Sequence, residues 1–317
     1  MTPRCVEASL SVGESMDGTA PESCAWIVLE HPGPWGARIL QGTALPAPVA
    51  DHLRSGKEAG VTTLLARRPE TRAQRAGLHA WIARSTPGGL LLREGDLDSY
   101  EDVLSWDLSA IGRGELPPFG SVSTAPVHFV CTNGARDQCC AIEGRALVAD
   151  LCTAAEASAP RSDVWECSHI GGHRFAPVML TLPSGAVHGR VSAAQARSII
   201  AQADRAEIPL EAYRGRSGLP SALQAVGIAA RRRFDIRGID DIDVLRVVGD
   251  RAVPMPAHTP LEAGEITCEV RHRDGRAWRT SVRQEPQGQL RPESCGKEPV
   301  IAHRWQVADF TPVPNWT

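Results

Sequence analysis

Blocks of apolar and polar positions along the first third of the chain predict a strand–helix–strand unit. Residues 24–30 (CAWIVLE) form a compact apolar run typical of a buried strand, and the Pro/Gly-rich HPGPWG ends it. Residues 46–60 begin with prolines, show helical spacing and finish on glycine, so they predict a helix. Residues 61–67 (VTTLLAR) predict the next strand.

A hairpin and a short helix complete this unit. The segment GLHAWIARSTPGGLLLREGDL predicts two strands that turn at Pro87, Gly88 and Gly89. The segment SYEDVLSW then predicts a helix with Ser99 as its N-cap.

The middle of the chain repeats this order with little shared sequence. Strands are predicted at PVHFVC and DVWECS, and a helix at AIEGRALVADLCTAAEA lies between them. A hairpin turning at Pro183, Ser184 and Gly185 follows, and then a helix capped by Ser192. The crossover helix makes the first two strands parallel, which is the order of a thioredoxin-like domain. Pro177 opens the hairpin at the position where such a domain often carries a cis-proline.

The last third predicts a smaller unit. A helix at SALQAVGIAARRRF follows the Gly/Pro-rich YRGRSGLP, and a strand at DVLRVVG comes next. A hairpin turning at Asp274 and Gly275 and a closing strand at PVIAHRWQVADF complete it.

We therefore expect an α/β (α+β) fold with two thioredoxin-like domains in tandem plus a small C-terminal α+β segment. The expected division is a flexible N-terminus at 1–20, a degenerate thioredoxin-like domain without ligands at 21–118, a thioredoxin-like domain with the candidate ligands at 119–212, and the C-terminal α+β segment at 213–317.

Composition and charge narrow the function. The 317 residues are 42% hydrophobic and 22% charged, which is ordinary for a globular protein. A net charge of -3 gives no basic footprint for nucleic acid, and the run Arg231–Arg233 is typical of a solvated helix face. No apolar run reaches the length of a membrane span, and the N-terminus lacks a signal core. We expect a cytoplasmic protein without a nucleic-acid or membrane partner, in which clustered cysteines indicate metal or redox chemistry.

The candidate ligands lie in CTNGARDQCC and, some thirty residues later, in CSHIGGHRF. Cysteine at a helix N-terminus has a lowered pKa, which favours the thiolate that metals bind. Two cysteines and two histidines fit either a structural zinc ion or a [2Fe–2S] cluster. Zinc sites usually space their cysteines two to four residues apart, whereas Cys131 and Cys140 enclose a longer loop, which favours the cluster.

These motifs carry a family resemblance. FVCTNGARDQCC, followed by SHIGGHRFAPVMLTLPSGAVHGRV, resembles the sucrase/ferredoxin-like family, and EHPGPWG and YRGRSGLPSALQA support the match. Members of that family resemble thioredoxin-like [2Fe–2S] ferredoxins. The resemblance implies that the cluster ligands are Cys131, Cys140, His169 and His173. Cys139 is the alternative to Cys140, and Arg174 is expected beside the ligands, where it would stabilise the cluster's negative charge.

The resulting expectation is an electron carrier rather than a substrate-turnover enzyme. It would exchange electrons with a reductase or an acceptor protein, and imidazole ligands would couple this to protons. The alternatives are a zinc-stabilised structural or interaction module and a thiol oxidoreductase using Cys139 and Cys140, which lacks the Cys-x-x-Cys spacing. The other cysteines are expected to be buried thiols at Cys152 and Cys167, and scattered structural or exposed residues at Cys5, Cys24, Cys268 and Cys295.

Overall fold

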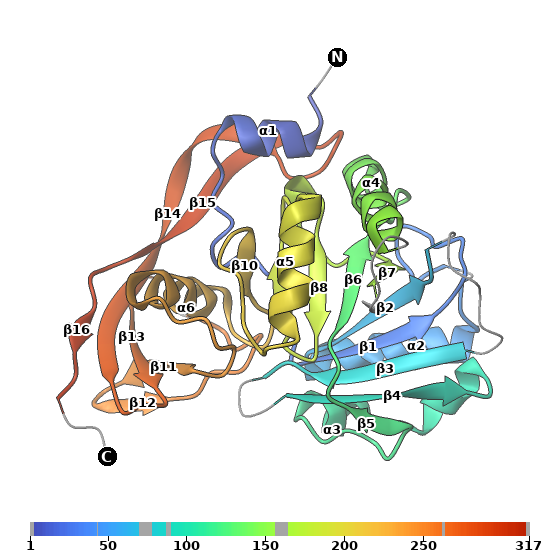
Figure 1. Cartoon of the computed structure of the whole chain (residues 1–317), viewed down its shortest axis with the longest axis horizontal. Helices are drawn as coiled ribbons and strands as arrows, with labels where there is room; N and C mark the ends of the chain where they lie inside the picture. Colours follow the sequence, from blue (N-terminus) through green and yellow to red (C-terminus); the bar gives the residue numbers. More distant parts are fainter. Residues whose placement is uncertain are drawn as a thin grey trace.

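The computed structural model of the chain describes residues 3–42, 44–69, 78–86, 90–155, 164–261 and 264–314. Within these residues the strands form two sheets (Figure 1). The larger sheet has ten strands in the order β10-β9-β8-β6-β7-β2-β1-β3-β4-β5, and the smaller one has six. Helices and strands are mixed along the chain, so the expected α+β class is confirmed.

The first repeat contains the elements that its apolar pattern predicts. They are β1 (Ala25–Glu30), α2 (Ala47–Ser55), the 3-10 helix η1 (Gly56–Ala59), β2 (Val61–Arg67), β3 (Leu78–Arg84), β4 (Leu91–Leu97), the 3-10 helix η2 (Tyr100–Ser105) and α3 (Leu108–Gly112). β1 and β2 are parallel, and β3 and β4 are antiparallel. Ser99 precedes η2 as expected, although this element is 3-10 rather than α-helical. The turn predicted at 87–89 lies outside the described residues.

The second repeat follows the same order. Its elements are β5 (Ser121–Ser123), β6 (Val127–Cys131), α4 (Gln138–Ala155), β7 (Val164–Cys167), the 3-10 helix η3 (His173–Phe175), β8 (Met179–Leu182), β9 (Ala186–His188), α5 (Ala193–Ala203) and β10 (Tyr213–Arg216). β6 and β7 are parallel, and β8 and β9 are antiparallel. Ser192 caps α5 by accepting a hydrogen bond from the amide of Gln195. The peptide bond before Pro177 is cis, as the sequence suggested.

The two repeats share one sheet and one core. β2 pairs antiparallel with β7, where the guanidinium of Arg67 contacts the carboxylate of Glu166 at 2.6 Å. Trp81 of the first repeat meets Phe129 and Trp165 of the second edge-on, with ring centroids 5.4 and 4.7 Å apart. Because these strands are not all neighbours in the sheet, the sheet must curl until its inner faces pack together. The division into two domains stays a prediction.

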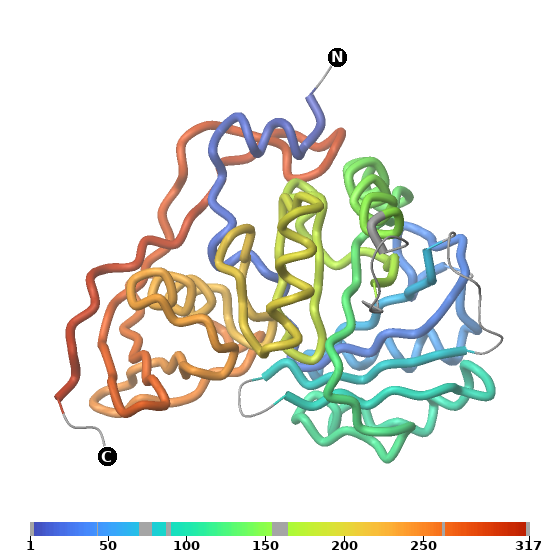
Figure 2. The backbone as a smooth tube through the Cα atoms, in the orientation of Figure 1, coloured from blue at the N-terminus to red at the C-terminus, as the bar shows by residue number. Residues whose placement is uncertain are grey.

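Helices cover the outer faces of the curled sheet. α2 packs Val49 and Leu53 against the first repeat, whereas α4 and α5 pack together against the second. Figure 2 shows α4 and α5 side by side over the second repeat. Helix α4 also packs on β6, and the end of this strand and the start of the helix carry the candidate cysteines.

The third segment forms the smaller sheet. Its elements are α6 (Ser221–Phe234), β11 (Ile242–Val248), β12 (Arg251–Val253), β13 (Ile266–His272), β14 (Ala277–Pro292), β15 (Pro299–Val307) and β16 (Thr311–Pro312). The turn predicted at Asp274 and Gly275 between β13 and β14 is confirmed, with Gly275 at φ +95°. α6 packs on this sheet, where Phe234 stacks on Trp278 at 4.1 Å between ring centroids. The outer halves of β14 and β15 form a long ribbon (Figure 1).

The beginning of the chain differs from the flexible start that we expected. Residues Cys5–Ser11 form helix α1, which lies against the ribbon of β14 and against η3 (Figure 1). Cys5 and Ser9 are fully buried there. The helix has seven residues, too few to be stable alone, so its tertiary contacts hold it in place.

Among the described helices, none combines the length and the apolar content that crossing a membrane requires.

Candidate metal centre

A tight junction between β6 and α4 positions the two cysteines of the first motif. Cys131 is the last residue of β6, and Cys140 lies in the first turn of α4. Asp137 caps this helix, because its Oδ1 accepts a hydrogen bond from the amide of Cys139 at 2.9 Å. Gly144 lets the helix approach closely, since a Cβ at this position would collide with the carbonyl oxygen of Cys131. Sequence reasoning missed Gly144.

Cys131, Cys140 and His169 converge on one point. Nδ1 of His169 lies 3.8 Å from Sγ of Cys131 and 3.9 Å from Sγ of Cys140. The three donor atoms all lie within 4.8 Å of one another, so they could hold a metal ion. Both cysteines are buried, and His169 is partly exposed. The site is therefore closed on its cysteine side and nearer to solvent on its histidine side.

His173 lies next to this group but farther out. Its ring centroid is 5.1 Å from that of His169, and the two rings are inclined by 32°. Nε2 of His173 faces Oδ2 of Asp137 at 3.7 Å. Nδ1 of His173 is buried and has no hydrogen-bond partner among the described residues. A buried nitrogen without a partner is costly, and a bound metal would satisfy it.

The pKa values of the thiols of Cys131 and Cys140 are shifted in opposite directions. The pKa of Cys131 lies well below its ordinary value, first because the Cys140 thiol donates a hydrogen bond to it and then because of the His169 ring. The pKa of Cys140 is raised by that same hydrogen bond and by burial. Burial lowers the pKa of His173, which keeps this ring neutral, the form that binds metals.

A buried arginine holds the histidine loop in place. Arg214 of β10 donates hydrogen bonds to the carbonyl of Gly171 at 3.0 Å, and to the hydroxyl and the carbonyl of Thr19. Gly172 has φ +77°, and a Cβ there would collide with the Arg214 guanidinium. The two glycines of the motif therefore serve a loop that packs directly on an arginine, rather than a helix.

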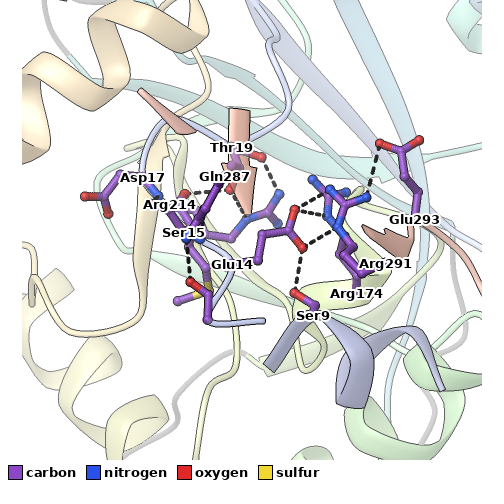
Figure 3. Close-up of polar contacts among 12 residues, drawn as sticks. Ser9, Glu14, Ser15, Asp17, Thr19, Arg174, Arg214, Gln287, Arg291 and Glu293 are labelled. Carbon is purple, nitrogen blue, oxygen red and sulfur yellow. Dashed lines mark hydrogen bonds and ion pairs between the residues drawn. The ribbon is translucent and has the colours of Figure 1, made fainter. Parts of the chain in front are cut away.

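Arg174 takes part in a second buried contact (Figure 3). Its Nε donates to Oε1 of Glu14 at 2.8 Å, and Arg291 binds the same carboxylate through two nitrogens at 2.7 and 2.5 Å. Ser9 of α1 donates to Glu14 as well. This network ties the histidine loop to the start of the chain and to the ribbon. Sequence reasoning found neither Glu14 nor Arg291, because they are distant in sequence and belong to no motif.

Cys139 belongs to a different group. Its Sγ lies 3.4 Å from Sγ of Cys5 and 3.5 Å from Sγ of Cys295, beside the carboxylate of Asp137. A hydrogen bond from the Cys5 thiol is the first cause that lowers the pKa of Cys139, to about 7. We had expected Cys5 and Cys295 to be scattered, but both belong to this group. Cys152, Cys167, Cys24 and Cys268 are buried and lie outside both groups.

Comparison with known proteins identifies one related family. The family model described as Sucrase/ferredoxin-like matches residues 16–215, which include the first metal-binding group and both repeats. No curated protein and no solved structure matches the chain.

Proposed function

The chain belongs to the sucrase/ferredoxin-like family, and we propose that it is an electron-transfer protein that binds a [2Fe–2S] cluster through Cys131, Cys140, His169 and His173. The observation that carries this proposal is the convergence of two thiols and one imidazole nitrogen, beside a second imidazole whose buried nitrogen has no partner in the described part of the chain.

The spread of the donors favours two irons over one zinc ion. Ligands of a single zinc ion each lie about 2.0–2.3 Å from it, so all four must converge closely. Cys131, Cys140 and His169 meet this condition, but His173 lies outside their group. A binuclear core is wider and accepts a fourth donor farther from the thiols. A zinc ion remains the alternative, because three donors alone suit one ion.

The protein side of the centre has three roles. The buried thiols of Cys131 and Cys140 exclude water from one side, and the partly exposed His169 gives electrons a short route to a partner. Arg214 lies buried near Cys131, where its positive charge offsets the negative charge of the thiolates. When bound, the cluster supplies a one-electron couple whose potential imidazole ligands raise above that of all-cysteine clusters.

Proton coupling would involve His173. With Nδ1 of His173 as a ligand, Nε2 would hold the exchangeable proton, and the carboxylate of Asp137 at 3.7 Å would favour its retention. Reduction adds negative charge nearby and raises the affinity of this nitrogen for a proton.

The thiol oxidoreductase alternative has less support. The sulfurs of the neighbouring residues Cys139 and Cys140 face different groups, so the two do not form a dithiol pair. We propose reductase and acceptor proteins as partners, and the cytoplasm as the compartment, because all nine cysteines are free thiols.

Anaerobic purification followed by visible spectroscopy and assays of iron and acid-labile sulfide tests the proposal. We expect a red-brown protein that dithionite bleaches, and loss of iron and sulfide in Cys131→Ser. Cys167→Ala is the matched control, because Cys167 pairs with Cys131 across the β6–β7 ladder but belongs to neither group. Stoichiometric zinc that is lost in Cys131→Ser, without iron or sulfide in the wild-type protein, would select the zinc alternative.

A further inference from the structure

A second set of metal-binding side chains lies beside the proposed cluster site and shares none of its residues. It consists of Cys5, Asp137, Cys139 and Cys295, with one ligand atom of each within 4.8 Å of the others. The residues come from three distant segments, namely α1, the start of α4, and the loop between β14 and β15. The family match begins at residue 16 and ends at 215, so two of the three cysteines lie outside it.

We propose that this group is a structural zinc site in which three thiolates and one carboxylate bind the ion. Cys5, Cys139 and Cys295 provide the sulfurs, and Asp137 provides an oxygen.

The donor set selects the metal. Three thiolates favour soft or borderline cations, and zinc accepts sulfur and carboxylate oxygen in a tetrahedral site of four protein ligands. Binding releases the thiol protons to solvent and changes no oxidation state. Three neighbouring thiols also suit an ion better than a disulfide, because a disulfide would leave one sulfur unused.

The sulfurs are arranged around Cys139. Its Sγ lies 3.4 Å from that of Cys5 and 3.5 Å from that of Cys295. The amide of Cys5 donates a hydrogen bond to Sγ of Cys295 at 3.4 Å. Cys139 lies at the N-terminus of the long helix α4, whose dipole favours negative charge. The dipole and the neighbouring thiols favour the thiolate form of Cys139, the central sulfur of the group.

Asp137 is oriented for a role as the fourth ligand. Oδ1 accepts a hydrogen bond from the amide of Cys139, and Oδ2 accepts from Ser294 at 2.8 Å and from the amide of Cys295 at 3.0 Å. A carboxylate has about four lone-pair sites, so these three hydrogen bonds fix its direction and leave one site for an ion. Its oxygens lie 3.7 and 3.8 Å from Sγ of Cys5.

The burial fits a closed structural site. The side chains of Cys5, Cys139 and Asp137 are removed from solvent, and Cys295 is the partly exposed member through which an ion would enter. An ion bound here would hold α1 and the ribbon loop onto α4, closing very long segments of chain.

Cobalt(II) substitution in the full-length protein tests the site. Zinc is removed with a chelator under reducing conditions, Co²⁺ is titrated in, and the thiolate-to-cobalt charge-transfer and ligand-field bands are recorded. We expect the spectrum of a tetrahedral thiolate site in the wild-type protein, and its loss in Cys139→Ser. Cys295→Ser, in a partly exposed loop, should keep the fold and show a weaker band from one fewer sulfur. Metal analysis of the protein as purified should show zinc.

Two controls separate this site from the cluster site. Cys152 lies in α4, like Cys139, but outside both groups, so the Cys152→Ser protein should keep the cobalt spectrum. Cys131→Ser should keep it too while losing iron and sulfide, whereas Cys295→Ser should keep iron and sulfide. The proposal is overturned if the wild-type protein gives no thiolate–cobalt band, if Cys139→Ser retains it, or if Cys131→Ser abolishes it. A mass decrease showing a disulfide among the three cysteines of the freshly purified protein would also overturn it.

Discussion

The carboxylate of Asp137 lies 3.7 Å from Nε2 of His173, while its other oxygen caps the helix that carries Cys139 and Cys140. One residue therefore lies between the proposed cluster site and the proposed zinc site. Burial alone would raise the pKa of Asp137, but hydrogen bonds from the amides of Cys139 and Cys295 and from Ser294 outweigh it and lower this pKa to about 2. It is ionised throughout the neutral range.

This relationship predicts a change in proton coupling. Asp137→Asn removes a negative charge beside His173, so the ring should bind its proton less tightly and the midpoint potential should rise. In potential-against-pH titrations, the sloping region should move to lower pH. Ser294→Ala is the control, because it removes a hydrogen bond to Asp137 without changing charge. A profile that is flat in the wild-type protein would contradict proton coupling.

The identity of the histidine ligands predicts the direction of a potential shift. In His169→Cys, a thiolate replaces a neutral imidazole and adds negative charge. The midpoint potential should therefore fall toward the value of plant-type ferredoxins, which is about −400 mV. Protein-film voltammetry or dye-linked titration measures it, with Cys167→Ala as the control. An unchanged potential in a protein that retains its iron would exclude His169 as a ligand.

The histidine loop predicts a cost at Gly172. Gly172→Ala places a side chain at φ +77° and against the Arg214 guanidinium, so stability should fall by about 1–3 kcal/mol. Urea unfolding measures the change, and iron content should fall with it. Gly249→Ala has a similar backbone strain, at φ +58°, but none of the described residues has an atom within 4 Å of the added Cβ. It should keep its full iron content, and equal iron loss in both variants would contradict the collision argument.

The buried carboxylate of Glu14 predicts a pH dependence of stability. Burial alone would raise its pKa, but Arg291 and Arg174 outweigh this and the net shift is downward. A depressed folded-state pKa gives stability that is present above the unfolded value and is lost as the pH falls through the folded value. Glu14→Gln should therefore cost about 3–5 kcal/mol at neutral pH and flatten the acid loss.

Urea midpoints measured between neutral pH and the acid transition check the Glu14 prediction. Glu143→Gln is the control, because Glu143 pairs with Arg4 at 2.6 Å near the surface. Such pairs contribute about 0–1 kcal/mol, so this variant should change little. A Glu14→Gln protein with wild-type stability and the same acid slope would contradict the prediction.

Local sequence patterns predicted the elements that local chemistry determines. Residues 61–67 form the expected strand, Ser192 caps its helix, and Gly275 makes the expected turn. The proximity of Cys131, Cys140 and His169 agrees with their motifs, because each motif follows one of two adjacent parallel strands.

Contacts between distant segments were not predictable in this way. Cys139 lies 134 residues from Cys5 and 156 from Cys295, so no spacing motif joins them. Helix α1 escaped prediction because its stability comes from what it packs against, and the pattern of seven residues carries little signal. The pairing of Glu14 with Arg291 is of the same kind.

The position of Cys295 near the end of the chain sets an order of assembly during synthesis. On the ribosome, the residues of the proposed cluster site emerge first and can meet while the ribbon of β14 and β15 is still untranslated. The three-thiol group and the clasp of Arg291 on Glu14 can close only afterwards. The residues of the proposed cluster site can therefore come together in the nascent protein before the ribbon joins the start of the chain.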